Sequence, residues 1–259
     1  MLINSKKRCA NYRKRILELS QKVSALHIGG SFSCIEIMDV IFNSLMTKKE
    51  KELFILSKGH ASILQYVILE HQSVIKKKDL NQYCQKTGFL GVHPDIGNPG
   101  INASTGSLGH GLSMAAGVAL AEKSKKKRVF VILSDGELQE GSTWEAIMLI
   151  PALKLKNLIL IVDNNDLQSL EKTSSTHPDL YPIEKKFKSF GWESDTCDGH
   201  NSKKIFKFLS KKNRSKPYAL IAKTIKGYPI SFMKNKPIWH YKSPSKEQYE
   251  LALKELGFK

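Results

Sequence analysis

The sequence predicts an α/β fold with a central, mostly parallel sheet flanked by helices. The first observation is a pair of apolar runs, at 129–133 and 158–162, separated by a segment of helical character. Such a strand–helix–strand unit pairs its strands in parallel through a right-handed crossover. The second observation is a polar turn after each run, at 135–137 and 163–165. Because parallel strands end at one edge of the sheet, the two turns should face each other across a ligand-binding crevice.

The other elements follow along the chain as such a fold requires. Helical spacing of apolar residues predicts an amphipathic helix over residues 6–26. Ser33, with Glu36 three residues later, predicts a capped helix that runs to residue 45. The segments 88–102 and 172–182 should be loops. The remaining helices are expected at 61–70, 76–86, 112–123, 187–192, 205–212 and 246–256, and the remaining strands at 53–56, 193–196 and 218–224.

Length and composition indicate one large domain. The 259 residues can bury a sizeable core, and 41% hydrophobic with 25% charged residues is ordinary for a globular protein. We expect a single domain over residues 1–259, with a C-terminal arm from about residue 229 where regularity is lost. No apolar run approaches the ~20 residues of a membrane helix, and residues 1–20 lack the apolar core of a signal peptide. These features predict a cytoplasmic protein without a membrane partner.

The net charge of +17 does not indicate a nucleic-acid partner. Of the 41 basic residues, 36 are Lys and five are Arg, and the Lys are spread over the whole chain. A nucleic-acid surface more often concentrates Arg in one stripe. The charge therefore predicts a solvated surface that could also attract anionic sugar phosphates or an acidic partner chain.

Polar residues at the two strand ends predict a metal site. Asp135 follows the first apolar run of the central unit, and Asn165 follows the second. A carboxylate and a carboxamide at one edge of a sheet suit a hard divalent cation such as Mg²⁺. That ion takes oxygen ligands and is usually shared between a few protein groups and a diphosphate.

Four motifs resemble the N-terminal half of transketolase, and they occur along the chain in the order of that family, over about residues 10–245. Asp135-Gly136-Glu137 with Asn165 thirty residues after the Asp is similar to the diphosphate-binding motif of thiamine-diphosphate enzymes. The segments Leu-Ser-Lys-Gly-His at 56–60, Ser-Thr-Gly-Ser-Leu-Gly-His-Gly at 104–111 and Leu-Gln-Glu-Gly at 138–141 narrow the resemblance to transketolase. It implies the thiamine-diphosphate-binding fold, with thiamine diphosphate and a divalent cation (Mg²⁺, or Ca²⁺ or Mn²⁺) as cofactors.

The resemblance assigns roles to individual residues. The metal ligands would be Asp135, Asn165 and the backbone carbonyl of Leu167. The catalytic histidines would be His27 and His240, which handle hydroxyl protons of the sugar, and His93 at the donor's C1 hydroxyl. Residues implied to bind the cofactor are His60, Gly106, Ser107, Leu108, Gly136, Glu137 and Asn165, and residues implied at a dimer interface are Glu140 and Glu145.

Two residues depart from the family's pattern. Val92 precedes His93 in Gly-Val-His-Pro, where the family more often has Gly-His-Pro. Tyr241 follows His240 where Gly is common. A tyrosine there should either narrow the mouth of the pocket or move the His240 loop.

The resemblance also implies a missing half. A full transketolase chain is more than twice as long, and its second domain carries the glutamate that activates the cofactor. We therefore expect this chain to be the N-terminal subunit of a split transketolase, active in ketol transfer between sugar phosphates only with a C-terminal subunit, in an α₂β₂ assembly. The alternatives are the α subunit of a 2-oxoacid dehydrogenase and a non-catalytic binding homologue. The donor and acceptor sugars stay open.

Overall fold

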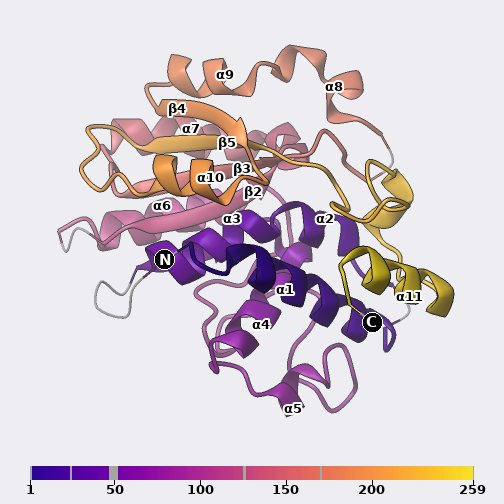
Figure 1. The fold of residues 1–259 in the computed structure, drawn as a ribbon. Coiled ribbons are helices and arrows are strands. Elements are labelled where there is room, and N and C mark those ends of the chain that lie inside the picture. The colour runs from indigo at the N-terminus through magenta and orange to yellow at the C-terminus, as the bar shows by residue number, and fades with distance from the viewer. Residues whose placement is uncertain (1, 24, 47–51, 125–126, 170, 259) are drawn as a thin grey trace.

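Five parallel strands form the centre of the computed structural model, which describes residues 2–23, 25–46, 52–124, 127–169 and 171–258 (Figure 1). The strands are β1 (Leu53–Leu56), β2 (Val129–Ser134), β3 (Leu158–Asn164), β4 (Glu193–Asp198) and β5 (Tyr218–Lys223). They lie in the order β1-β2-β3-β5-β4, and each neighbouring pair is parallel. The prediction of a mostly parallel sheet flanked by helices is confirmed.

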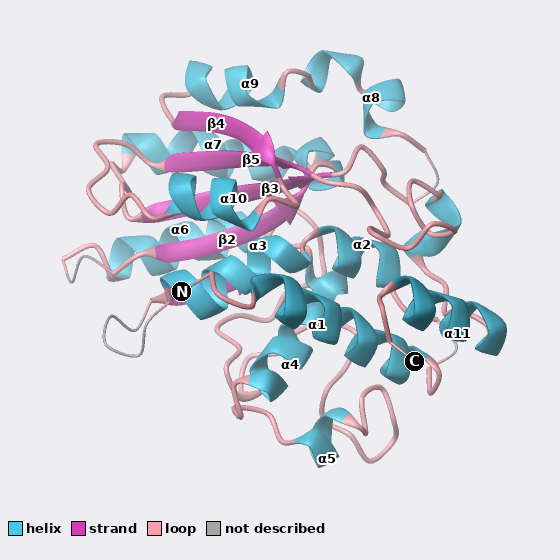
Figure 2. Cartoon of the chain, in the orientation of Figure 1, coloured by secondary structure: helices cyan, strands magenta, loops and turns pink. Residues whose placement is uncertain are grey.

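Helices cover both faces of the sheet (Figure 2). One layer contains α6, α7 and α9, and the other contains α1, α3, α4 and α10. The helices are α1 (Ser5–Ser20), α2 (Ile28–Ser33), α3 (Ile35–Val40), α4 (Ser62–His71), α5 (Lys77–Leu80), α6 (Gly111–Ala121), α7 (Gly141–Ala152), α8 (Thr173–Thr176), α9 (Ile183–Ser189), α10 (Ser202–Leu209) and α11 (Lys246–Glu255). A π-helical turn, Ile41–Leu45, continues α3, and short 3₁₀ turns lie at Gly59–Ala61, Gly136–Gln139, Pro178–Leu180 and Pro237–His240.

The central strands are apolar on both sides because each side meets a helical layer. On β2, Phe130 and Ile132 belong to the core under α1, α3 and α4, whereas Val129, Val131 and Leu133 belong to the core under α6 and α7. All five side chains are fully buried. This two-sided burial explains why the strands are uninterrupted apolar runs in the sequence rather than alternating ones.

The predicted helix over 33–45 differs from the structure. Ser33 is the last residue of α2 and makes no N-cap, so the predicted capping box is wrong. Its hydroxyl lies 2.9 Å from the Gly30 carbonyl and 2.5 Å from Asp163 Oδ2. Glu36 instead forms an ion pair with Arg13. Both side chains that a capping box would have used are therefore bonded to residues distant in the sequence instead.

Other boundaries differ by smaller amounts. Helix α1 ends at Ser20 rather than at residue 26, and the predicted loop 172–182 contains α8 and a 3₁₀ turn. The segment after Pro229, predicted as an arm, packs back on the core through Ile230, Met233 and Trp239, which are at most 2% exposed. Among the described residues, no helix combines the length and the apolar character needed to span a bilayer.

Candidate cofactor and substrate site

A pocket lies at the carboxyl edge of the sheet, where β1, β2 and β3 end. Strands β2 and β3 are in register there, with Ser134 opposite Asp163. The cavity has a volume of about 190 Å³. Its lining residues come from seven separate segments and are Gly30, Lys58, His60, Leu108, Ser134, Gly136, Gln139, Glu140, Asn165, Leu167, Gln168, Ser169, Lys226 and His240.

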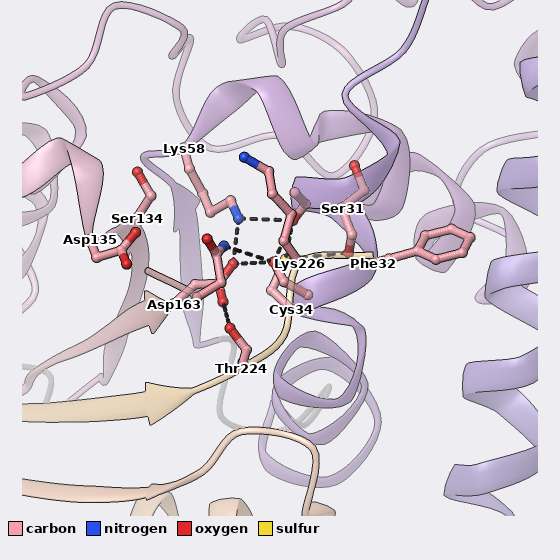
Figure 3. A network of polar contacts seen from close by, with 12 residues as sticks. Ser31, Phe32, Cys34, Lys58, Ser134, Asp135, Asp163, Thr224 and Lys226 are labelled. Carbon is pink, nitrogen blue, oxygen red and sulfur yellow. Dashed lines mark hydrogen bonds and ion pairs between the residues drawn. The ribbon is translucent and has the colours of Figure 1, made fainter. Parts of the chain in front are cut away.

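Buried charged residues lie at and next to this pocket, at the ends of β1, β2 and β3 and in the turn after β5 (Figure 3). We call Lys58, Asp135, Asp163 and Lys226 the floor. Lys58 and Asp163 are fully buried and form an ion pair, and Lys58 Nζ also donates to the Gly30 carbonyl at 2.8 Å. Burial lowers the pKa of Lys58, but the charge and hydrogen bond of Asp163, together with Cys34 and Asp135, outweigh burial and raise that pKa above its ordinary value. Lys58 is therefore held as an ammonium ion inside the chain.

Asp163 accepts two further hydrogen bonds, from residues that lie far from it in the sequence in both directions. Ser33, at the end of α2, donates to Oδ2, and Thr224, just after β5, donates to Oδ1. With Lys58, these donors satisfy both carboxylate oxygens of a residue with no exposed surface. The sequence analysis did not single out Lys58 or Asp163. The available signal was the position of each at the end of an apolar strand.

Asp135, a predicted metal ligand, is the buried carboxylate of the floor that has no cation bonded to it. Its Oδ1 accepts from the Gly136 N–H at 2.9 Å, and its Oδ2 accepts from the Asp166 N–H at 2.6 Å. Burial, together with the charge of Asp163, raises the pKa of Asp135 to about 7. A carboxylate in this state gains most from a cation placed beside it.

The two other predicted metal ligands lie on the next strand end. Asn165 Oδ1 accepts from the Leu167 N–H at 3.0 Å, and Asn165 Nδ2 lies 3.4 Å from Ser33 Oγ. The Leu167 carbonyl accepts from Lys226 Nζ at 3.1 Å. Asn165 and Leu167 line the pocket, and Asp135 lies directly behind Gly136, which also lines it.

These donors fit a hard cation shared with a diphosphate. They comprise one carboxylate, one carboxamide and one backbone carbonyl, all oxygen donors of the type that Mg²⁺ prefers. Across the described ranges, no group of three or more His, Cys, Asp or Glu is arranged to hold a metal. A cation at this edge would therefore depend on oxygen atoms that a bound phosphate supplies.

The glycine-rich segment before α6 passes close to the pocket. Gly106 has φ of +151°, and a Cβ there would lie 2.8 Å from His93 Cγ, so a side chain has no room. Leu108 lines the pocket, whereas Ser107 is exposed. Of the three residues predicted to bind the cofactor here, Leu108 therefore reaches the cavity, and Gly106 and Ser107 do not line it.

Glu137, predicted to bind the cofactor, lies behind the pocket and does not line it. Its Oε1 accepts hydrogen bonds from the Ser57 hydroxyl and from the Gly109 N–H, the latter at 2.9 Å. The side chain is fully buried. In this position Glu137 ties the glycine-rich segment to the end of β1.

Lys226 is a pocket residue that the sequence analysis missed. Its Nζ donates to the carbonyls of Leu167 and Gln168 at 3.1 and 2.9 Å, and it lies 3.0 Å from His240 Nδ1. Burial, with the nearby charge of Lys58, lowers the pKa of Lys226 to about 8. Its place in a turn after β5 was visible in the sequence, but no local pattern indicated that it reaches the pocket.

Three of the four predicted histidines form a cluster, and two of them, His60 and His240, line the pocket. We call His27, His60 and His240 the histidine cluster. The centroids of the His27 ring and the rings of His60 and His240 are 5.2 Å apart in each case, and those of His60 and His240 are 5.6 Å apart. The residues come from three segments, just before α2, just after β1 and in the C-terminal segment.

The histidine cluster is held neutral. Burial, with the charges of His93 and Lys226, lowers the pKa of His27 to about 4. Burial and the charge of Lys226 lower the pKa of His240 to about 3. Burial and Lys58 bring the pKa of His60 well below its ordinary value. Neutral imidazoles can accept a proton at pH 7 or donate a hydrogen bond to a hydroxyl group.

The remaining predicted residues lie around this cluster. His93 is exposed on the 88–102 loop, with its ring against Gly106. Tyr241 packs its ring 4.7 Å from that of His27 and leaves His240 in contact with both other histidines. Glu140 and Glu145 are exposed. The tyrosine therefore covers one side of His27 without moving the His240 loop away.

The chain matches the family model described as "Transketolase, thiamine diphosphate binding domain" over residues 5–259. It is 35% identical over 257 residues to a relative from Phocaeicola vulgatus that is named as one subunit of an apulose-4-phosphate transketolase, with 95% of this chain and 91% of the relative covered. It is 33% identical over 256 residues to "6-deoxy-6-sulfo-D-fructose transketolase subunit SqwG" of Clostridium sp., with 94% and 93% covered.

A solved structure has the same fold. The transketolase of Campylobacter jejuni superposes with a TM-score of 0.91 at 27% sequence identity. The match covers 100% of this chain but 44% of that one. The chain thus spans less than half the length of that transketolase and nearly the whole length of the two relatives named as subunits.

Proposed function

This chain belongs to the transketolase family, and we propose on that basis that it is the cofactor-binding subunit of a two-chain transketolase. The reaction would transfer a two-carbon ketol unit from a ketose phosphate to an aldose phosphate. The observation that supports this most directly is the pocket itself, where a buried carboxylate and two oxygen donors lie next to three neutral histidines.

The strand ends would hold the cofactor's diphosphate and its metal. Asp135, Asn165 and the Leu167 carbonyl would bind a divalent cation, for which Mg²⁺ is the first choice. Gly136 and the backbone of residues 106–108 would contact the cofactor, with His60 near its phosphates. Thiamine diphosphate, when bound, supplies the electron sink for a carbanion formed at a carbonyl carbon.

The histidine cluster would handle the protons of the sugar. Breaking the C2–C3 bond of a ketose requires the loss of the C3 hydroxyl proton. His27 and His240 are neutral and their rings lie 5.2 Å apart, with His240 lining the pocket, so either can accept that proton at neutral pH. His93, on the opposite loop, would bind the C1 hydroxyl of the donor.

A second chain would complete the enzyme. The two relatives that this chain matches along most of their length are each named as one subunit of a transketolase, which implies a further chain in those enzymes. We infer that the partner of this chain is a C-terminal subunit, in an α₂β₂ assembly that places Glu140 and Glu145 at an interface. A single domain over the whole chain and a cytoplasmic location stay predictions.

Reconstitution tests this function. The chain would be assayed for ketol transfer alone and with the candidate C-terminal subunit, with thiamine diphosphate, Mg²⁺ and several ketose and aldose phosphates. Activity is expected only in the mixture. Full activity of the isolated chain would refute the two-chain proposal, and decarboxylation of pyruvate in place of ketol transfer would indicate the 2-oxoacid dehydrogenase alternative.

The metal ligands have their own test. Asp135→Asn in the reconstituted enzyme should weaken Mg²⁺-dependent binding of thiamine diphosphate on the order of 100-fold or more, because it removes the carboxylate from the donor set. Titration calorimetry with and without a chelator measures this effect. Glu184→Gln, a change of a first-turn residue of α9 away from the pocket, serves as the control. Equal cofactor affinity in Asp135→Asn and the control would refute the metal assignment.

A further inference from the structure

A histidine that does not line the pocket contacts the turn that carries Lys226. His200, between β4 and α10, accepts the Ile225 N–H on its Nε2 atom at 2.9 Å. Its ring stacks on that of Tyr228, with centroids 3.9 Å apart and planes at 26°. One side chain thus contacts the residue before Lys226 and a residue two positions after it.

His200 is itself fixed by a buried ion pair. Its Nδ1 lies 3.0 Å from Glu36 Oε2, and the other oxygen of Glu36 is 2.7 Å from a guanidinium nitrogen of Arg13. The side chains of all three are at most 10% exposed. Arg13 Nε also donates to the Tyr228 carbonyl at 3.0 Å. Helices α1 and α3 therefore both contribute to holding the turn.

The hydrogen bonds define the protonation state of the His200 ring. A backbone N–H can only donate, so the Nε2 atom that receives it carries a lone pair and no proton. A neutral ring then has its proton on Nδ1, where it points at the Glu36 carboxylate. Burial would raise the pKa of Glu36, but the charge of Arg13 and the hydrogen bond from His200 together outweigh it and keep that pKa below its usual range, so the acceptor is ionised.

The other side of the turn is the pocket. Lys226 Nζ contacts two carbonyls of the β3 end and His240 Nδ1. The following residue, Gly227, donates its N–H to the Gly29 carbonyl at 3.1 Å, and a Cβ at Gly29 would lie 2.7 Å from the Trp239 carbonyl. The turn thus contacts the segment after β3 and the segments that carry His27 and His240.

We propose that His200 is a positioning residue of the cofactor site, which, oriented by Glu36, fixes the Ile225 N–H and so holds Lys226 in the pocket. The consequence for the cofactor rests on the proposed function, but the arrangement of the turn does not. No local sequence pattern indicates this role, since Glu36, the partner of His200, is 164 positions away.

The ring and the turn can be tested in the isolated chain. In ¹⁵N spectra, His200 should show an unprotonated Nε2 and a protonated Nδ1, with coupling between Nε2 and the Ile225 amide nitrogen. In His200→Phe, which keeps an aromatic ring on Tyr228, amide exchange at residues 225–227 should accelerate at least about tenfold beyond any global change. A protonated Nε2, or exchange that changes only in step with global stability, would overturn the proposal.

The reconstituted enzyme tests the consequence for the cofactor. His200→Phe should raise the apparent KM for thiamine diphosphate about tenfold or more, the equivalent of one lost hydrogen bond, and leave kcat at saturating cofactor within about threefold. His200→Gln, which restores an acceptor at similar reach, should recover most of the affinity. His71→Phe, at the exposed end of α4, is the matched control.

The outcomes separate this inference from the proposed function. If the wild-type mixture shows no ketol transfer, the proposed function fails, while the spectra still decide the geometry. If the wild-type mixture is active and His200→Phe keeps the wild-type KM, the positioning role is refuted. An equal loss in His200→Gln and His200→Phe would also refute it, because the acceptor would then make no difference.

Discussion

The floor and the histidine cluster lie side by side in one pocket, yet they are built in opposite ways. In the floor, Lys58 and Asp163 are fully buried, charged and bonded to each other. In the histidine cluster, the rings are neutral, and His27 Nδ1 is buried with no hydrogen-bond partner among the described residues. Tyr241, which covers His27, is 55% exposed.

This difference distinguishes polar groups that are bonded within the chain from polar groups whose hydrogen bonds are left for a ligand. A buried charge must be paired inside the chain, because leaving it unpaired costs several kcal/mol. A neutral imidazole costs less to leave without a partner, so its hydrogen bonds can be kept for a ligand. The Lys58–Asp163 pair of the floor is therefore complete within this chain, whereas Asp135 and the histidine cluster keep polar atoms that a ligand could use.

Breaking the floor should cost the most stability. Lys58→Met leaves the Asp163 carboxylate buried without its cation, and the free energy of unfolding should fall by about 3–5 kcal/mol. Urea denaturation followed by circular dichroism measures the change. The double variant Lys58→Met with Asp163→Asn should lose less than the sum of the two single losses. A loss below about 1 kcal/mol in Lys58→Met would contradict the role given to the floor.

Changing the histidine cluster should affect catalysis and leave stability nearly unchanged. His27→Phe removes a buried nitrogen that has no partner, so the free energy of unfolding should stay within about 1 kcal/mol of wild type. Ketol transfer by the reconstituted enzyme should slow by about 10²–10⁴-fold, since a proton acceptor is lost. A variant that unfolds as readily as Lys58→Met would remove the distinction between the two regions.

The low pKa of His27 should make the folded chain less stable in acid. Between pH 6.5 and about 4, the unfolded chain protonates His27 and the folded chain does not, so the unfolded chain binds more protons and stability falls as pH decreases. Asp135, whose pKa is raised to about 7, has the opposite effect. The comparison must therefore be made between wild type and His27→Phe, which share Asp135.

The expected difference is in the melting temperature. When the pH is lowered from 7.5 to 5, the Tm of wild type should fall a few degrees more than the Tm of His27→Phe. In a chain of this size, each kcal/mol lost from the free energy of unfolding lowers the Tm by roughly 2–4 °C. Scanning calorimetry at both pH values measures it. Identical pH dependence in the two proteins would show that His27 has an ordinary pKa in the folded state.

The smallest effect concerns the cover of the histidine cluster. Tyr241→Ala exposes one side of His27, and because burial is the main cause of its low pKa, that pKa should rise from about 4 towards its ordinary value. An NMR titration of the His27 ring measures the change, with Tyr241→Phe as the control that keeps the cover. An equal pKa in both variants would show that Tyr241 does not shield His27.

The strands and the strand-end turns could be predicted from the sequence because their signals are local. Apolar runs at 53–56, 129–133 and 158–162 became β1, β2 and β3 within two residues. Asp135 and Asn165 were found because each directly follows such a run. The cap at Ser33 was mispredicted for the complementary reason, since Asp163, 130 positions away, took the hydroxyl that a local rule assigned to a helix end.

Periodicity and motifs of a few adjacent residues were enough to predict the sheet, the edge where its strands end and the residue types gathered at that edge. Which polar groups line the pocket and which lie outside its lining depends on contacts between residues far apart in the sequence. Lys58 and Asp163, 105 positions apart, became one buried pair, and Glu137 turned away from the cavity. The physical reason is that a buried charge must be paired, and its partner can come from any part of the chain that the fold places nearby. A local sequence pattern therefore does not identify that partner.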